Sequence, residues 1–159
     1  MLKPITYSLQ FRGRASSATP DRMRLRLTAP SSALVTSLAP DGVQGAFEDV
    51  AGGDATLEAE LSLREHSAFD DAGTIEFGHG NSVSFRSLGL GRLVECPDRN
   101  LRHGTVVCQV EGGNGQFERA EGLITSNFLV SDTGEVTDNH LGLIFVHEGR
   151  SEASAVRKE

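Results

Sequence analysis

Residues 55–64 read ATLEAELSLR, and their apolar side chains fall at every second position. Successive side chains of a β-strand point to opposite faces, so this spacing produces one apolar face and one polar face. On a helix the same residues would surround the axis instead of forming a stripe. The run therefore predicts a long, half-buried strand, and it decides how the rest of the chain is interpreted.

The same period of two recurs in segment after segment of the chain. Apolar and polar residues alternate from Ile5 to Phe11 and again from Met23 to Leu27. The predicted strands are 5–11, 22–27, 32–38, 43–47, 55–63, 75–77, 83–85, 105–110, 122–130 and 136–146. About eight to ten strands and no long helix predict an all-β protein.

Turn-forming residues separate these strands. Proline presets the backbone of a turn and glycine accepts a positive φ, so 39–42, 78–81 and 131–134 are predicted to be hairpin turns. Residues 69–73 are predicted to form a loop. The stretch 89–91, which reads Gly-Leu-Gly, predicts a bend or bulge, which is one way in which a sheet coils tightly enough to close.

So many short strands in one small domain predict a sandwich or a barrel, because only closure removes every hydrogen-bonding edge. The hairpin order favours a single antiparallel up-and-down β-barrel over residues 1–147. A lipocalin-like, calycin-type barrel and a jelly roll are the alternatives. A barrel of about eight strands is just wide enough to be filled by side chains or to hold one small ligand. Residues 148–159 lack an apolar period and are predicted to form a polar C-terminal tail.

The chain has 159 residues, of which 38% are hydrophobic, and this fits one domain with one core. Its net charge of -7 opposes attraction to nucleic acid and to anionic lipid. No apolar run approaches the roughly 20 residues of a membrane helix, and the first residues lack the apolar region of a secretory signal. We expect a soluble, cytoplasmic protein without a nucleic-acid or membrane partner.

Charge is distributed unevenly along the chain. Residues 12–26 carry five arginines against one aspartate, whereas residues 41–76 carry ten acidic side chains against one arginine. One interpretation is a pair of solvated strand faces that attract each other within the fold or across a homodimer. The other is an arginine clamp for a carboxylate or a phosphate.

Cysteine and histidine patterns give no support for a metal or another cofactor. Cys96 and Cys108 are the only cysteines, and they lack the Cys-x-x-Cys spacing of zinc and redox sites. The five histidines contain no His-x-His pair and no His-Glu-x-x-His run. No cofactor is predicted, and a reducing compartment fits the cysteine count.

The stretch 112–122 reads GGNGQFERAEG and leads directly into a predicted strand. Its glycines interrupt the strand pattern, and the spacing of Phe117 and Ala120 predicts one turn of helix that faces inward. It lacks the Lys-Ser or Lys-Thr ending of a phosphate-binding loop and precedes a strand instead of a helix, so nucleotide binding is disfavoured. We interpret the stretch as a helical turn that closes one end of a barrel.

The pattern Gly-x-Gly-x-Phe-x-x-Ala-x-Gly before a closing hairpin resembles the allene oxide cyclase and dirigent-like barrels, a group that includes small bacterial barrels. The resemblance covers mainly residues 104–146. It implies a cavity that binds a small apolar molecule and steers its cyclisation, isomerisation or radical coupling. It carries no catalytic residue over to a position of this chain.

Polar residues interrupt the last two predicted strands, at Thr125, Ser126 and Asn127 and again at Asp138 and His140. Asp138 and His140 share one face of a strand, so the carboxylate can set the tautomer of the imidazole and raise its basicity, as in a general base. The alternative is an exposed turn at the mouth of the barrel, where Asp138 only binds backbone donors.

Four further positions have both a functional and an ordinary interpretation. His79 lies in a glycine-flanked corner. It is either an acid or base at the rim of the barrel or an ordinary turn residue. The hydroxyl of Tyr7 points into a cavity, or its ring only packs in the core. Arg86 anchors an anionic group inside, or it faces outward. Cys108 is most simply a small buried side chain.

Together these observations predict a cofactor-independent isomerase, cyclase or lyase that acts on a small, largely apolar molecule inside the barrel. A non-catalytic barrel that binds a small ligand or assembles with itself, for example as a dimer, is the alternative. The predicted catalytic residues are His79, Asn127, Asp138 and His140, and the predicted substrate-binding residues are Tyr7, Arg86, Thr125 and Phe128.

Overall fold

A computed structural model describes residues 1–148, so the predicted tail lies outside the described residues from 149 onward. The described chain contains nine strands and two single turns of 3-10 helix, η1 (Glu65–Ser67) and η2 (Gly115–Phe117). The strands are β1 (Leu2–Thr19), β2 (Arg22–Ala39), β3 (Gly42–Leu63), β4 (Ala68–Glu76), β5 (Ser82–Ser87), β6 (Gly91–Glu95), β7 (Leu101–Asn114), β8 (Glu121–Ser131) and β9 (Glu135–His147). None of the described helices is long and apolar enough to cross a membrane.

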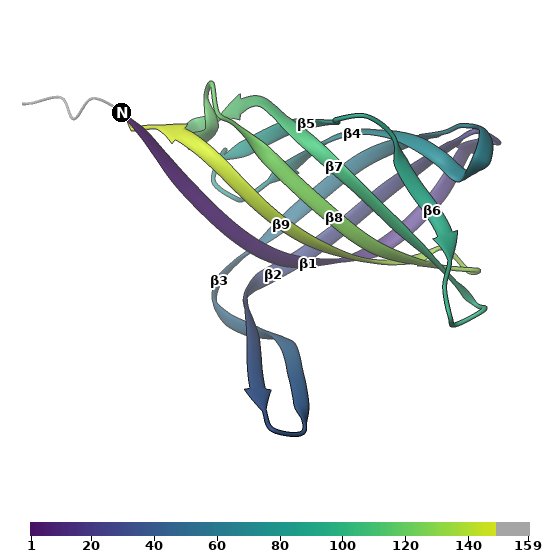
Figure 1. The fold of residues 1–159 in the computed structure, drawn as a ribbon. Coiled ribbons are helices and arrows are strands. Elements are labelled where there is room, and N and C mark those ends of the chain that lie inside the picture. The colour runs from purple at the N-terminus through teal and green to yellow at the C-terminus, as the bar shows by residue number, and fades with distance from the viewer. Residues whose placement is uncertain (149–159) are drawn as a thin grey trace, which may run out of the picture.

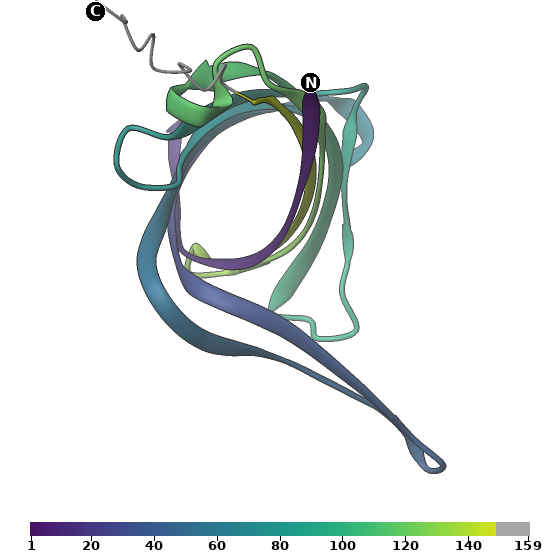
Figure 2. The ribbon, with the colours of Figure 1, turned by 90° about the vertical axis from the view of Figure 1, so that its left-hand side faces the viewer.

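The strands form one antiparallel sheet in the order β3-β2-β1-β9-β8-β7-β5-β4-β6, and an additional pairing of β3 with β4 closes it into a ring (Figures 1 and 2). Strands β5 and β6 both pair with β4 and with β7, so together they fill one position of the ring. The polypeptide bends between β5 and β6 at Gly89, whose φ is +78°. The predicted bend is therefore confirmed.

The core lies inside the ring, where each strand contributes every second side chain. In the run 55–64, Ala55, Leu57, Ala59 and Leu61 are buried, as the period of two predicts. Full burial of one such leucine stabilises the fold by about 2 kcal/mol. At one end, Phe117 and Ala120 are buried beside η2, so the inward-facing helical turn is also confirmed.

Residues 69–73 are not a loop, because they belong to β4. The turn lies earlier, at η1, where His66 and Ser67 adopt φ values of +58° and +61°. Phe69 and Asp71 both point inward and are buried. A carboxylate at an inward position interrupts the apolar alternation, and this concealed the strand in the sequence.

Three aromatic side chains lie across inward-facing glycines of the neighbouring strand. The directly opposed pairs are Phe69 with Gly91, Phe128 with Gly104, and Tyr7 with Gly142. A Cβ added at Gly104 would lie 2.0 Å from Cζ of Phe128, and one added at Gly142 would lie 2.1 Å from Cε1 of Tyr7. These glycines therefore fix the position of the aromatic rings inside the ring of strands.

Strands β2 and β3 continue beyond the ring as a two-stranded extension, here called the arm (residues 31–53), which projects from the ring (Figures 1 and 2). The turn at its tip joins Ala39 to Gly42, as predicted. The arm leaves at Pro30, where the register of β2 with β3 shifts. Consequently β2 pairs with β1 only from Arg12 onward, and residues 2–11 of β1 pair with β9 alone.

Candidate functional site

Six polar side chains from five strands gather inside the ring, and together they are called the interior cluster. Its members are Tyr7 (β1), Asp71 (β4), Cys108 (β7), Ser126 (β8), Asp138 and His140 (β9). Each lies at an inward position of its strand. Polar groups in such a place must be hydrogen-bonded or they destabilise the fold.

Asp138 is the centre of the hydrogen bonds in this cluster. Its Oδ1 accepts from Ser126 Oγ at 2.5 Å, and its Oδ2 lies 2.9 Å from Nε2 of His140. The geometry follows from the strands. Asp138 and His140 are two residues apart on β9, and Ser126 of β8 is directly opposite His140 in the pairing of β8 with β9. A carboxylate only accepts, so this contact places the imidazole proton on Nε2.

The predicted pairing of Asp138 with His140 is thus present, and the alternative of an exposed mouth is wrong. The two side chains are only 5% and 4% exposed. The ring of Phe11 covers the imidazole edge-on, with 4.9 Å between centroids. The three polar groups do not form a nucleophilic triad, because Ser126 donates to Asp138 and not to the histidine.

Asp71 reaches the cluster from β4, on a separate strand from the other carboxylate. Its Oδ2 accepts from Cys108 Sγ at 3.8 Å. Burial, followed by the charge of Asp138, raises the pKa of the Asp71 carboxyl from 3.8 to about 7, against smaller lowering effects of His140 and Cys108. Burial also raises the pKa of the Cys108 thiol, followed by the effect of Asp71, so this cysteine stays protonated and is a poor nucleophile.

Several buried polar atoms have no hydrogen-bond partner among residues 1–148. Three of the four belong to the interior cluster, namely Tyr7 Oη, Asp71 Oδ1 and His140 Nδ1, and the fourth is Ser32 Oγ. Leaving such an atom unpaired costs about 1–3 kcal/mol. The cluster therefore contains one donor and two further polar atoms whose hydrogen bonds are not made by the described residues.

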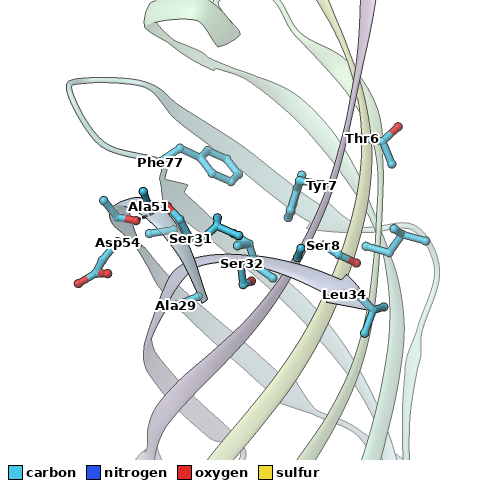
Figure 3. Close-up of a pocket in the computed structure, with 16 residues that line it drawn as sticks. Thr6, Tyr7, Ser8, Ala29, Ser31, Ser32, Leu34, Ala51, Asp54 and Phe77 are labelled. Carbon is cyan, nitrogen blue, oxygen red and sulfur yellow. Dashed lines mark hydrogen bonds between the residues drawn. The ribbon is translucent and has the colours of Figure 1, made fainter. Parts of the chain in front are cut away.

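A pocket of about 700 Å³ opens where β2 and β3 leave the ring (Figure 3). Small and apolar side chains dominate its lining, with Ala29, Leu34 and Phe77 among them. Tyr7 lines this pocket and packs edge-on against Phe77, with 5.2 Å between ring centroids. Ser32, the fourth residue with an unpartnered atom, also lines it.

Tyr7 therefore belongs both to the pocket and to the interior cluster. Burial raises the pKa of the Tyr7 hydroxyl above its usual value, and the charge of Asp138 acts in the same direction. The hydroxyl stays protonated at any physiological pH and serves as a hydrogen-bond donor. Tyr7 therefore lines the pocket and also carries the buried donor of the interior cluster.

Strand alternation places four predicted site residues away from the interior. His79 is exposed in the turn between β4 and β5, with a φ of +55°. Thr125 and Asn127 are exposed on the outer face of β8, one step from the inward Ser126. Arg86 is exposed on β5, with Nε 3.6 Å from Glu111.

Phe128, the remaining predicted residue, is buried and packs edge-on against Phe69 with 5.8 Å between ring centroids. Phe128 is therefore a core residue that points inward from β8. The alternation of β8 and β9 was visible in the sequence, but the pattern did not reveal which of the two faces is buried.

The unequal charge distribution is explained largely within the fold. Arg22 and Arg24 pair with Glu60 at 3.2 and 3.8 Å, and Arg26 pairs with Glu58 at 2.9 Å, across the contact of β2 with β3. These pairs are exposed, so each is worth about 1 kcal/mol or less. Arginines that are engaged in this way form no clamp for a free anion.

Sequence reasoning missed Asp71 as a site residue and treated Cys108 as apolar packing. A usable signal exists for Asp71, since residues 69, 71, 73 and 75 read Phe, Asp, Gly and Ile and form one inward face of β4. Within residues 1–148, no three His, Cys, Asp or Glu side chains are grouped to hold a metal ion.

The chain was compared with protein-family models, with curated proteins and with solved structures, and no match was found in any of the three comparisons.

Proposed function

We propose that the chain binds a small, largely apolar molecule in the pocket beside Tyr7, and that the closed sheet is a ligand-binding β-barrel of the allene oxide cyclase and dirigent-like kind. The observation that carries this proposal is the buried Tyr7 hydroxyl, which has no partner among residues 1–148 and belongs to a residue that lines the pocket. A bound oxygen atom would satisfy this donor.

The lining of the pocket indicates the class of ligand. It is mostly apolar, and the polar groups it contributes are hydroxyls, with Ser31 and Ser32 among them. Asp54 is the single charged residue in the lining, and it is exposed. The ligand is therefore an uncharged, mostly hydrocarbon molecule with one acceptor oxygen, such as a carbonyl, a hydroxyl or an epoxide.

A pair of probes tests this proposal. The protein should bind 2-naphthol about five times more tightly than naphthalene, since one hydrogen bond is worth about 1 kcal/mol. In Tyr7→Phe the ring remains and the hydroxyl is lost, so the preference for 2-naphthol should disappear. Fluorescence titration measures both affinities, and Thr105→Val, at an exposed position of β7 outside the pocket lining, serves as the control.

The proposal is wrong if neither probe binds, or if Tyr7→Phe keeps the full preference for 2-naphthol. The Thr105→Val control should bind both probes as the unchanged protein does, because Thr105 is exposed and does not line the pocket.

A cofactor-independent isomerase or cyclase is the second candidate function, and the carboxyl of Asp71 is the observation that favours it. A carboxyl with a pKa of about 7 can both take and return a proton at neutral pH. In that role it would remove a proton from carbon beside a carbonyl group, while the Tyr7 hydroxyl donates to the enolate oxygen, and the proton then returns to a different carbon.

The exchange of deuterium from heavy water into 2-tetralone, measured by NMR, tests this second candidate. The protein should accelerate exchange beside the carbonyl, and Asp71→Asn should abolish the acceleration while leaving 2-tetralone bound. Binding without accelerated exchange in the unchanged protein would leave ligand binding as the function and eliminate the acid–base role.

A further inference from the structure

The arm presents one apolar face to its surroundings. Cross-strand pairing places Leu34 opposite Phe47 and Leu38 opposite Val43, so these four side chains share a face. Leu38 and Val43 are 83% and 68% exposed. The opposite face carries the pair Ser37 and Gln44, which is the next pair along from Leu38 and Val43.

Such an arm needs a covering surface. A two-stranded hairpin alone is at best marginally stable in water, and an exposed apolar face weakens its solubility as well. Among the arm residues from Ala33 to Gly53, every residue except Phe47 is exposed, and even Leu34 and Val35 keep 50% and 41% of their surface exposed. The stability of the arm is therefore expected to come from contact with another molecule.

The ring carries a second apolar surface, here called the wall patch (Leu123, Leu141, Leu143 and Phe145). These residues point outward from β8 and β9, and all four are exposed. They are contiguous, since Leu123 is paired with Leu143. A sheet face that meets only water usually carries polar residues at such positions.

A groove of about 740 Å³ lies between the base of the arm and the ring. It runs from the apolar face of the arm to the wall patch. Leu34 and Phe47 of the arm lie on one side, and Leu141 of the wall patch lies on the other. The groove is open to solvent.

Charge favours the arm of a second copy as the occupant. The arm carries Asp41, Glu48 and Asp49 and no basic residue, whereas β1 carries three basic residues and no acidic one. Arg12 of β1 lines the groove and forms no ion pair within the described part of the chain. An acidic arm thus matches a groove whose lining contains one arginine and no acidic residue.

We propose that two copies of this chain form a symmetric dimer by exchanging arms, with each arm in the groove of the other copy and its apolar face against apolar side chains. The contact is isologous, because the same arm and the same groove are used twice around a two-fold axis. Exposed apolar residues on the arm and on the wall patch then become buried together.

Light scattering during gel filtration tests the dimer. The unchanged protein should have the mass of two chains at about 100 μM, since dimerisation depends on protomer concentration. The double substitution L38E/V43E on the apolar face should give the mass of one chain. The matched control S37E/Q44E adds the same charge on the opposite face of the arm and should remain dimeric. Circular dichroism confirms that the variants keep their strands.

Complementation tests the exchange itself. Leu143→Glu in the wall patch should also give monomers, but an equal mixture of Leu143→Glu with L38E/V43E should regain part of the dimer, because one intact arm then meets one intact groove. A monomeric unchanged protein, or a dimer that survives L38E/V43E, would overturn the proposal.

Discussion

Replacing Asp71 with asparagine should remove a pH dependence of stability that the unchanged protein shows between about pH 4 and pH 7. In the folded protein the Asp71 carboxyl keeps its proton up to about pH 7, whereas in the unfolded chain it loses the proton near 3.8. Between these values the folded state binds more protons, so a rise in pH favours unfolding. The stabilising contribution of Asp71 is complete below the pKa of the unfolded chain, 3.8. It is lost as the pH rises through the pKa of the folded protein, about 7.

The expected effect is large. One group of this kind changes the free energy of unfolding by at most about 1.4 kcal/mol per pH unit. The separation of the two pKa values allows about 4 kcal/mol in total, of which about 3 kcal/mol falls between about pH 4.5 and pH 8. The amide introduced by Asp71→Asn carries no charge at any pH, so the advantage of this variant over the natural protein should grow by that amount from about pH 4.5 to pH 8.

Urea denaturation of both proteins at several pH values measures this difference, with Asp70→Asn as the control. Asp70 is the neighbouring residue on β4, but it lies toward the outer face and hydrogen-bonds to Arg64. The Asp70→Asn curve should run parallel to that of the unchanged protein. Parallel curves for Asp71→Asn as well would mean that the Asp71 carboxyl is not buried as described.

Asp138→Ala should destabilise the fold by about 3 kcal/mol, because it leaves two buried groups unpaired at once. The Ser126 hydroxyl and the Nε2 proton of His140 both lose their acceptor. The imidazole would then have no partner on either nitrogen, since Nδ1 is already unpaired. Thermal and urea denaturation at neutral pH measure the loss.

A triple variant separates lost hydrogen bonds from lost packing. Ser126→Ala, Asp138→Leu and His140→Phe together replace the polar groups with apolar side chains, and such replacement of all partners is often nearly neutral. The triple variant should therefore be more stable than Asp138→Ala alone. If Asp138→Ala changed the stability no more than Asp49→Ala on the exposed arm, the Asp138 hydrogen bonds would contribute little.

The sequence was sufficient to predict most of the strands and the closure of the sheet, because both depend on local patterns, but it did not predict β6 or residues 68–74 of β4. The period of two in 55–64 identifies β3, and Gly89 marks the break between β5 and β6. The pairing of Asp138 with His140 was also predictable, since two residues separated by two on a strand must share a face.

Other features depend on which face of each strand is buried, and alternation alone does not reveal this. Asn127 and Ser126 are equally polar neighbours, yet only Ser126 points inward. Asp71 was hidden because an acidic residue in an inward position looks like part of a loop. The arm was predicted as a hairpin, but its departure from the ring at Pro30 depends on the register of β2 with β3.

The most direct test of the proposed function is a crystal structure of the protein with 6-bromo-2-naphthol, in which anomalous scattering locates the bromine. We expect the bromine in the pocket lined by Tyr7 and Phe77, with the ligand oxygen within hydrogen-bonding distance of Tyr7 Oη. Bromine found only on the outer faces of the strands, with the Tyr7 hydroxyl still without a ligand, would contradict the proposal that this pocket binds small apolar molecules.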